Sequence, residues 1–464
     1  MNTLIKNAYI ITMNKNREII ENGYILVNGN KIKDIDKTDN LPKKYEKYNI
    51  YDARGKVIIP GLINTHTHLF QGLLKGLGDD RNLVDWFREV TGPSAINLEP
   101  EDCFVAAKLG VLESILSGVT TLFDFMYPHH QKGLSEPIIK ALGESGIRGI
   151  YGRGYIDFGV QYGIPEELLE DYNDVIEDVE NLYNKYNNSY GGRVKIWLTP
   201  SMIWSQTKEG LEETRKFSRV KNIPVAIHVS ETPFERENAK TRFGKNDLDF
   251  LESINFLGPD TLAIHCVHLN ERDLRILKYY DVKVSYNPVS NMYLSSGVAP
   301  IPSMIRSGIT VGLATDGPAS NNNQNMIQTL KFASLLQKVD TLDPTVITAE
   351  KVMEMATIDA AKALGLESDI GSIEKNKKAD LVILNFNNPF SIPNLHPISA
   401  LVYSGVSTEV ESVMVNGEFI LKENKLLGLD SEGILIKAQN KAEKLAERAD
   451  TSHLRHRPWR QIAF

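Results

Sequence analysis

Short apolar runs that each lead into a polar residue recur along the middle of the chain. The runs lie at 57–59, 223–227, 261–264 and 309–315, and patterns typical of helices separate them. Strands that alternate with helical segments indicate βαβ units and a parallel sheet. The pattern therefore predicts a (β/α)8 TIM barrel over residues 59–367.

The two ends of the chain show a different pattern, in which apolar and polar residues alternate between short turns. Such alternation is typical of antiparallel strands. We expect a small β-sandwich domain built from both termini, residues 1–58 and 368–464, with a charged amphipathic helix at about 431–448 and a basic tail. The alternating stretches are 8–12, 23–27, 379–384 and 410–417.

Side chains with metal-binding chemistry stand at the ends of several predicted strands. His66 and His68 are two residues apart on an extended segment, so both imidazoles point to the same side. His228, His265 and Asp316 each follow an apolar run. The carboxyl ends of barrel strands meet on one rim, where such barrels carry their chemistry. Each residue alone suits a core or capping role, but together they predict a metal site.

Composition and charge limit the classes of partner that the chain is expected to bind. The chain has 464 residues, 42% of them hydrophobic and 24% charged, which suits a barrel with an accessory domain. A net charge of −7 gives no basic surface for nucleic acid, and no apolar stretch of membrane-spanning length occurs. The first residues lack the apolar core of a signal peptide, and two cysteines fit a reducing compartment. We expect a cytoplasmic homo-oligomer that binds neither nucleic acid nor membrane.

The chain carries five motifs: PGLINTHTH at 60–68, HVSE at 228–231, HCVHL at 265–269, NPVSN at 287–291 and TDG at 315–317. Together they resemble the amidohydrolase superfamily. Within it, the chain is most similar to the aromatic aminohydrolase branch, which includes methylthioadenosine/S-adenosylhomocysteine deaminases, guanine-type deaminases and triazine hydrolases. The resemblance covers nearly the whole chain and implies a hydrolase that acts on C–N bonds other than peptide bonds.

The resemblance implies one divalent metal ion held by His66, His68, His228 and Asp316. Imidazole and carboxylate ligands suit Zn²⁺, with Fe²⁺ as the alternative. Four protein ligands of this kind leave a position for water, and the metal lowers the pKa of that water toward about 7. The implied reaction is hydrolytic deamination by the resulting metal-bound hydroxide.

The same resemblance implies three catalytic residues, Glu231, His265 and Asp316. Glu231 takes a proton from the water and gives it to a ring nitrogen, which is general acid/base catalysis. His265 hydrogen-bonds the attacking hydroxide, and Asp316 passes a proton to the leaving ammonia besides binding the metal. Glu231 and His265 are not needed merely to hold a metal, so they favour an enzyme over a metal-binding barrel without catalysis.

Departures from the family pattern bear on the substrate. Ala95 and Ser201 stand where thioether-adenosine deaminases are expected to carry a glutamate and a histidine that hold the ribose. We therefore expect an amino-substituted N-heteroaromatic ring without a sugar, such as a purine base, a pterin or a triazine. A nucleoside deaminase of the methylthioadenosine type and a triazine chlorohydrolase are the alternatives. The expected substrate-binding residues are Gln71, Trp86, Tyr127 and Asn291.

Three further residues carry competing interpretations. In two-metal amidohydrolases a modified lysine bridges the metals, but Lys195 lies at the entry of its predicted strand, so we expect a single metal. His268 follows His265 by three residues and is expected to cap or pack a helix. His129 lies in a predicted loop over the same rim. It either contacts the substrate or has no functional role, and the sequence leaves both alternatives open.

Overall fold

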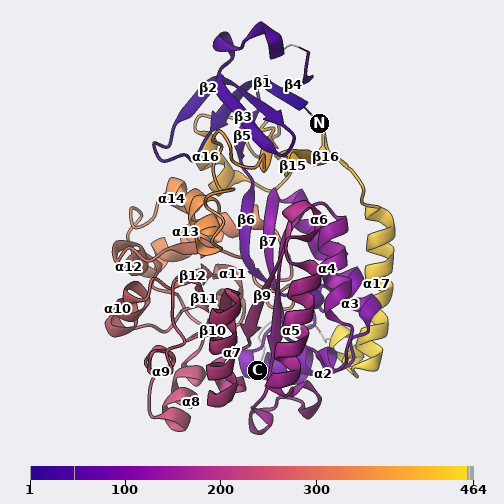
Figure 1. The fold of residues 1–464 in the computed structure, drawn as a ribbon, viewed down its shortest axis with the longest axis vertical. Coiled ribbons are helices and arrows are strands. Elements are labelled where there is room, and N and C mark those ends of the chain that lie inside the picture. The colour runs from indigo at the N-terminus through magenta and orange to yellow at the C-terminus, as the bar shows by residue number, and fades with distance from the viewer. Residues whose placement is uncertain (1, 46, 457–458, 460–464) are drawn as a thin grey trace.

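Eight parallel strands form the barrel, as the computed structural model shows (Figure 1). The structure describes residues 2–45, 47–456 and 459. The strands follow one another in chain order, each bonded to the next, which confirms the predicted (β/α)8 barrel. They are β6 (Leu62–Thr67), β7 (Val119–Met126), β8 (Arg148–Tyr155), β9 (Val194–Pro200), β10 (Val225–Val229), β11 (Thr261–His265), β12 (Lys283–Tyr286) and β13 (Val311–Leu313).

Helices connect the strands and cover the outside of the barrel (Figure 1). Within the described part of the chain, no helix is long and apolar enough to cross a membrane. The helices are α1 (Leu83–Trp86), α2 (Gly92–Ala95), α3 (Pro100–Leu116), α4 (Ser135–Glu144), α5 (Tyr172–Tyr186), α6 (Ser189–Gly192), α7 (Lys208–Lys221), α8 (Pro233–Phe243), α9 (Asp247–Ser253), α10 (Glu271–Tyr279), α11 (Pro288–Tyr293), α12 (Ile301–Arg306), α13 (Met326–Thr341), α14 (Ala349–Met355) and α15 (Ile358–Ala363).

Burial of the strands and helices follows their sequence periods. Every residue of β7 and β8 is buried, as expected for strands covered on both faces. In α5, by contrast, only Val175, Val179 and Leu182 are buried. Their spacing of three and four residues places them on one face of the helix, toward the barrel.

Strands from both termini form a second sheet at the end of the barrel where β6 begins (Figure 1). This confirms the split β domain. The strands hydrogen-bond as one continuous nine-stranded sheet in which β1 pairs parallel with β4 and β5. They are β1 (Asn2–Ile11), β2 (Ile19–Asn28), β3 (Lys31–Lys37), β4 (Asn49–Asp52), β5 (Val57–Pro60), β14 (Leu381–Leu384), β15 (Val410–Val415), β16 (Glu418–Lys422) and β17 (Lys425–Leu426).

One residue, Gly61, separates β5 of the terminal sheet from β6 of the barrel. It lies between β5 and β6, so the expected domain boundary at residue 58 falls inside a strand of the terminal sheet. We propose Gly61 as the boundary. A Cβ atom at this position would collide with the Thr120 side chain, and the Gly61 N–H donates to the Asp380 carbonyl at 3.0 Å. Close approach of the two sheets therefore requires glycine here.

A buried ion pair also holds the terminal sheet against the barrel. Arg148, at the start of β8, donates from Nε and Nη2 to the two carboxylate oxygens of Asp380, at 2.9 and 3.2 Å. The backbone N–H of Asn416 donates to the same carboxylate at 2.7 Å. Both side chains of the pair are less than a tenth exposed. Each charge is thus removed from water and depends on the other.

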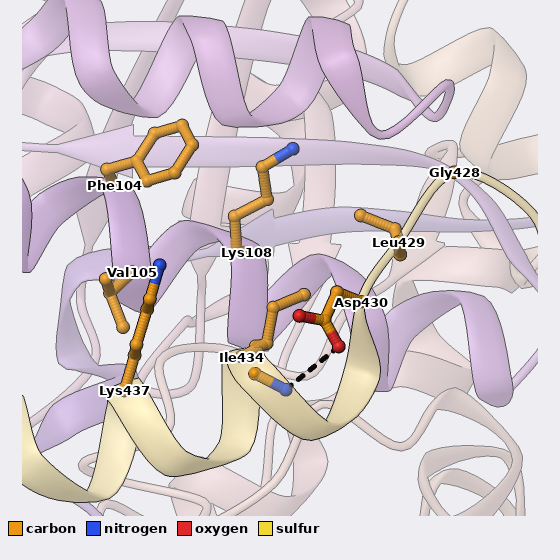
Figure 2. Close-up of a pocket in the computed structure, with 9 residues that line it drawn as sticks. Phe104, Val105, Lys108, Gly428, Leu429, Asp430, Ile434 and Lys437 are labelled. Atoms are coloured by element: carbon orange, nitrogen blue, oxygen red, sulfur yellow. Dashed lines mark hydrogen bonds between the residues drawn. The ribbon is translucent and has the colours of Figure 1, made fainter.

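The predicted C-terminal helix is confirmed as α17 (Ser431–Arg448), which packs along α3 on the outside of the barrel (Figure 1). Arg448 donates to the carbonyl of Asn97 at 3.1 Å and pairs with Asp102. A cavity of about 180 Å³ lies between α3 and the first turn of α17, with Lys108 among its walls (Figure 2). The last five residues of the expected tail lie outside the described residues. A short α16 (Pro397–Ser399) precedes β15.

We predict that Asp380→Ala lowers the free energy of unfolding by about 3–5 kcal/mol, because it leaves the Arg148 charge buried and unpaired. Denaturant unfolding followed by circular dichroism measures this. Glu136→Ala is the matched control, because its pair with Lys185 at 2.6 Å is about half exposed, and we expect a change within about 1 kcal/mol. Equal effects of the two variants would contradict the prediction. Arg148→Met combined with Asp380→Leu should recover most of the loss.

Candidate metal and catalytic site

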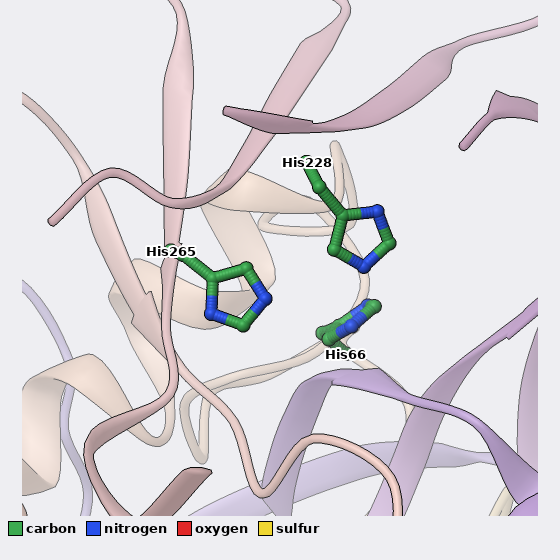
Figure 3. A group of neighbouring side chains, drawn as sticks. All are labelled: His66, His228 and His265. Carbon is green, nitrogen blue, oxygen red and sulfur yellow. The ribbon is translucent and has the colours of Figure 1, made fainter. Parts of the chain in front are cut away.

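Five predicted residues meet on the carboxyl rim of the barrel. His66 lies on β6 with His68 just after it, His228 lies on β10, His265 ends β11, and Asp316 follows β13. The rings of His66, His228 and His265 lie together, with the His66 ring roughly perpendicular to the other two (Figure 3). Two overlapping groups have ligand atoms within 4.8 Å of one another, namely His66 with His228 and His265, and His66 with His68 and Asp316. Strand-end positions far apart in sequence thus form one cluster.

The chemistry of this cluster fits a metal ion. Both ring nitrogens of His66 are buried and have no hydrogen-bond partner among the described residues. Nε2 of His66 lies 3.3 Å and Nε2 of His68 lies 3.6 Å from the same Oδ1 of Asp316. Buried polar atoms in proteins are almost always paired. A cation among these neutral nitrogens and the carboxylate would give one nitrogen of each ring a partner.

Backbone carbonyls fix the rings of His68 and His228. Nδ1 of His68 lies 2.5 Å from the carbonyl of Phe125, and Nδ1 of His228 lies 2.7 Å from that of Ser201. A carbonyl only accepts, so each Nδ1 carries the proton and donates. The lone pair of Nε2 is then free to bind a metal, an arrangement common for histidine ligands.

The electrostatics of the site favour neutral imidazoles beside an ionised aspartate. Burial lowers the pKa of His66 and that of His265 to about 3. It also lowers the pKa values of His68 and His228. Burial acts to raise the pKa of Asp316, but the close His66 ring and the other imidazoles outweigh it and hold that pKa well below its ordinary value. These are the protonation states that metal binding requires.

A buried hydrogen-bond network holds Asp316. Its backbone N–H donates to the carbonyl of His66 at 3.1 Å. Its own carbonyl accepts from the Gln324 side chain at 2.8 Å, and Gln324 accepts in turn from Thr67 at 2.8 Å. Asp316 and His265 have positive backbone φ angles of 63° and 71°, which residues other than glycine rarely adopt. Backbone strain of this kind is common at functional sites.

Glu231 lies beside the cluster, between β10 and α8. A capping box formed by Thr232 and Glu235 begins α8 directly after it and so fixes its backbone. Oε1 of Glu231 accepts from the Ser296 hydroxyl at 2.9 Å, and Oε2 lies 3.5 Å from Nε2 of His265. Burial, reinforced by the nearby carboxyls of Glu235 and Asp316, raises its pKa well above the ordinary value. Glu231 is therefore suited to hold and release a proton.

A narrow cavity opens onto these groups. About 30 Å³ of it is open to the centre of a water molecule, so little free room remains in it. Most of its polar lining residues belong to the metal cluster or are Glu231, and most of the others are apolar or aromatic. The lining residues are His68, Leu83, Trp86, Phe87, Tyr127, Met202, Trp204, His228, Glu231, His265, Leu294, Asp316 and Ser320.

The four expected substrate-binding residues take different places. Trp86 and Tyr127 line the cavity, and Nε1 of Trp86 donates to the carbonyl of Ala319 at 2.9 Å. Gln71 and Asn291 are buried outside the lining: Oε1 of Gln71 accepts from the Ala319 N–H at 3.4 Å, and the amide of Asn291 donates to Nδ1 of His265 at 3.0 Å. Substrate contact stays a prediction for all four.

The residues with competing interpretations lie away from the metal cluster. Nε2 of His268 donates to the carbonyl of Ser296 at 2.7 Å, a packing role. Lys195 donates to Asn188 at the opposite end of its strand. His129 contacts Ser135, Tyr151 and Arg153, and it does not line the cavity.

Several contacts of the site were not expected from the sequence. They include the Phe125 carbonyl on His68, the Ser296 hydroxyl on Glu231 and the Asn287 amide, 3.3 Å from Nδ1 of His265. The walls formed by Leu83, Phe87, Met202 and Leu294 were also missed. The NPVSN motif was the one available signal for Asn287, because it places an asparagine directly after a predicted strand.

Comparisons with known proteins agree with the expected resemblance. The model of the Amidohydrolase family matches residues 57–420. A 5'-deoxyadenosine deaminase of Methanobrevibacter smithii is 38% identical over 445 residues, which cover 96% of this chain and 98% of that protein. A 5-methylthioadenosine/S-adenosylhomocysteine deaminase of Thermoanaerobacter pseudethanolicus is 36% identical over 448 residues, 97% of this chain and 100% of that protein.

Solved structures share the fold over almost the whole length. An adenosine deaminase of Xanthomonas campestris with bound zinc has a TM-score of 0.88 at 23% identity, covering 96% of this chain and 99% of that chain. A guanine deaminase of C. acetobutylicum with bound guanine has a TM-score of 0.81 at 24% identity, covering 90% and 100%. These likenesses confirm the barrel with its terminal sheet.

We predict about one divalent metal ion per chain, as a site with three histidines and one carboxylate requires. Elemental analysis of the purified protein measures it. His68→Ala and Asp316→Ala should each lose the metal, whereas His265→Ala should keep it, which distinguishes the two overlapping groups. Two metal ions per chain, or loss of the metal in His265→Ala, would contradict this ligand set.

Proposed function

Because the chain belongs to the amidohydrolase family, we propose that it is a metal-dependent deaminase of an amino-substituted N-heteroaromatic ring. The reaction replaces the ring's amino group with oxygen from water and releases ammonia. One observation carries the proposal: Glu231 and His265 converge on a buried cluster that already suffices to bind a metal. The deaminase names of the relatives support the same reaction.

We propose that His66, His68, His228 and Asp316 hold the metal, with Zn²⁺ as the expected ion and Fe²⁺ as the alternative. Neutral imidazoles and an ionised carboxylate are the donors that both ions accept. When bound, the metal would lower the pKa of a coordinated water, so that hydroxide would be available for the attack near neutral pH.

The chain's own residues would then move the protons. Nε2 of His265 lies 3.5 Å from Oε2 of Glu231 and 3.9 Å from Oδ2 of Asp316, and we propose that the attacking water binds among these three groups. Glu231 takes a proton from this water and delivers it to a ring nitrogen, which makes the adjacent carbon electrophilic. His265 donates a hydrogen bond to the attacking oxygen. Asp316 takes the second proton of the water and passes it to the departing amine, which leaves as ammonia.

The cavity favours a flat ring without a sugar. Ala95 and Ser201 do not line it, and its walls away from the metal cluster include Leu83, Phe87 and Met202. A site that binds sugar hydroxyls needs polar groups on that side, because hydroxyls buried against apolar walls lose their hydrogen bonds to water. We propose a purine base, a pterin or a triazine as the substrate class.

Adenine nucleosides are the second candidate, because the names of the relatives favour them. Proteins 38% and 36% identical over nearly the whole chain are named 5'-deoxyadenosine and methylthioadenosine/S-adenosylhomocysteine deaminases. Both candidate classes present the same reacting unit, an amino group on a ring carbon beside a ring nitrogen. The proton transfers proposed for Glu231 and His265 apply equally to either class.

We predict that Glu231→Gln keeps the metal and lowers kcat at least about a hundredfold, because the amide cannot carry the proton between water and ring. Ammonia release and elemental analysis measure the two effects. Glu237→Gln is the matched control, the same change at an exposed position on α8, and it should retain full activity. Loss of the metal from Glu231→Gln would show that Glu231 is a ligand.

We predict a higher kcat/KM for a free ring than for any adenosine derivative. The test compares five compounds on one metal-loaded preparation and measures ammonia release. The compounds are guanine, an amino-substituted pterin, an aminotriazine, 5'-deoxyadenosine and methylthioadenosine. A site without sugar-binding groups gains nothing from the ribose, whereas a site built for it discriminates strongly. A higher kcat/KM for the nucleosides would establish the second candidate.

A further inference from the structure

His265 differs from His68 and His228 in the partner of its Nδ1 atom. The side-chain amide of Asn291 lies 3.0 Å from this nitrogen, and that of Asn287 lies 3.3 Å from it. The same amide nitrogen of Asn287 also donates to the carbonyl of Ser285 at 3.4 Å, which fixes its NH2 group on the side of His265. Nδ1 of His265 therefore accepts, where Nδ1 of the other two histidines donates.

The opposite side of the ring agrees with this assignment. With Nδ1 as the acceptor, the neutral ring carries its proton on Nε2. Nε2 faces Oε2 of Glu231 at 3.5 Å and Oδ2 of Asp316 at 3.9 Å, so its proton is directed toward two carboxyl groups rather than toward a donor N–H. A protonated Nε2 has no lone pair for a metal. His265 therefore does not serve as a metal ligand, although its position places it in a possible ligand group with His66 and His228.

We propose that Asn287 and Asn291 are positioning residues that fix the Nε2–H tautomer of His265, so that it donates to the attacking water and does not bind the metal. The catalytic half of this inference rests on the proposed deaminase reaction. The tautomer itself does not, because it follows from the contacts of a single ring.

The same segment also orients Glu231. Ser296, five residues after Asn291, donates its hydroxyl to Oε1 of Glu231 at 2.9 Å and leaves Oε2 toward His265. Asn291 lies in α11 and is buried, as is Ser296. The segment after β12 thus sets the direction of both groups that handle protons, although neither asparagine lines the cavity.

The test uses the zinc-loaded full chain with nitrogen-15-labelled histidine. Long-range proton–nitrogen correlation spectra show which ring nitrogen carries the proton, and His265→Gln identifies the signals. The variants are Asn291→Asp, whose carboxylate accepts from Nδ1–H, and Asn291→Leu, which removes the donor without adding charge. Asn238→Asp controls for a new carboxylate, because Asn238 is a buried residue of α8.

We expect the wild-type and Asn238→Asp proteins to show His265 protonated on Nε2. Asn291→Asp should move the proton to Nδ1, keep about one zinc per chain and lower kcat at least about a hundredfold, with a much smaller change in KM. A wrong tautomer of a catalytic histidine can cost about 10⁴-fold in kcat. Asn291→Leu should show both tautomers and an intermediate kcat.

Two results would overturn the inference. One is a wild-type His265 that carries its proton on Nδ1. The other is an Asn291→Asp or Asn291→Leu protein that keeps both the Nε2–H tautomer and the wild-type kcat. If the tautomer shifts as expected but the wild-type protein deaminates none of the rings or nucleosides, the proposed function fails and the positioning role of the asparagines stands.

Discussion

Closure of the barrel between its first and last strands is the constraint on which the site depends. Asp316 comes from the segment after β13, and His66 and His68 come from β6 and its end. The N–H of Asp316 donates to the His66 carbonyl at 3.1 Å, and the Asn64 amide donates to the Thr315 hydroxyl at 2.8 Å. These bonds cross the seam of the barrel. Without them the carboxylate and the two imidazoles would have no common position.

Polar side chains at this seam stay buried because they satisfy one another. Gln324 accepts from Thr67 and Thr315 and donates to the carbonyl of Asp316. A buried polar group without a partner costs about 1–3 kcal/mol, so removing one member exposes several others to that cost. Beside this network, neither ring nitrogen of His66 has a hydrogen-bond partner among the described residues, although Nε2 lies 3.3 Å from Oδ1 of Asp316. The unpaired nitrogens and the proximity of the histidines together support a metal site.

The sequence predicted the parts of the fold and site that depend on strand periodicity. Apolar runs gave the barrel, and the polar residues at their ends gave the cluster, because parallel strands bring their carboxyl ends to one rim. The pairing of the terminal strands could not be predicted in the same way. It depends on β5, which lies between β14 and β1 and joins strands from the two ends of the chain into one sheet. Side-chain contacts made by the segment after β12 could not be predicted, because periodicity does not place Asn291 on His265 or Ser296 on Glu231.

Gln71 has a structural contact besides the substrate contact that stays a prediction. Resemblance suggested that its amide would meet the substrate ring. In the structure Oε1 of Gln71 accepts from the Ala319 N–H, while the Ala319 carbonyl accepts from Nε1 of Trp86. A Cβ atom at Gly317 would collide with this amide. Gln71 thereby connects the strand end that carries His68 to a wall of the cavity. Substrate contacts that Trp86 makes would then be set by the same backbone segment that holds Asp316.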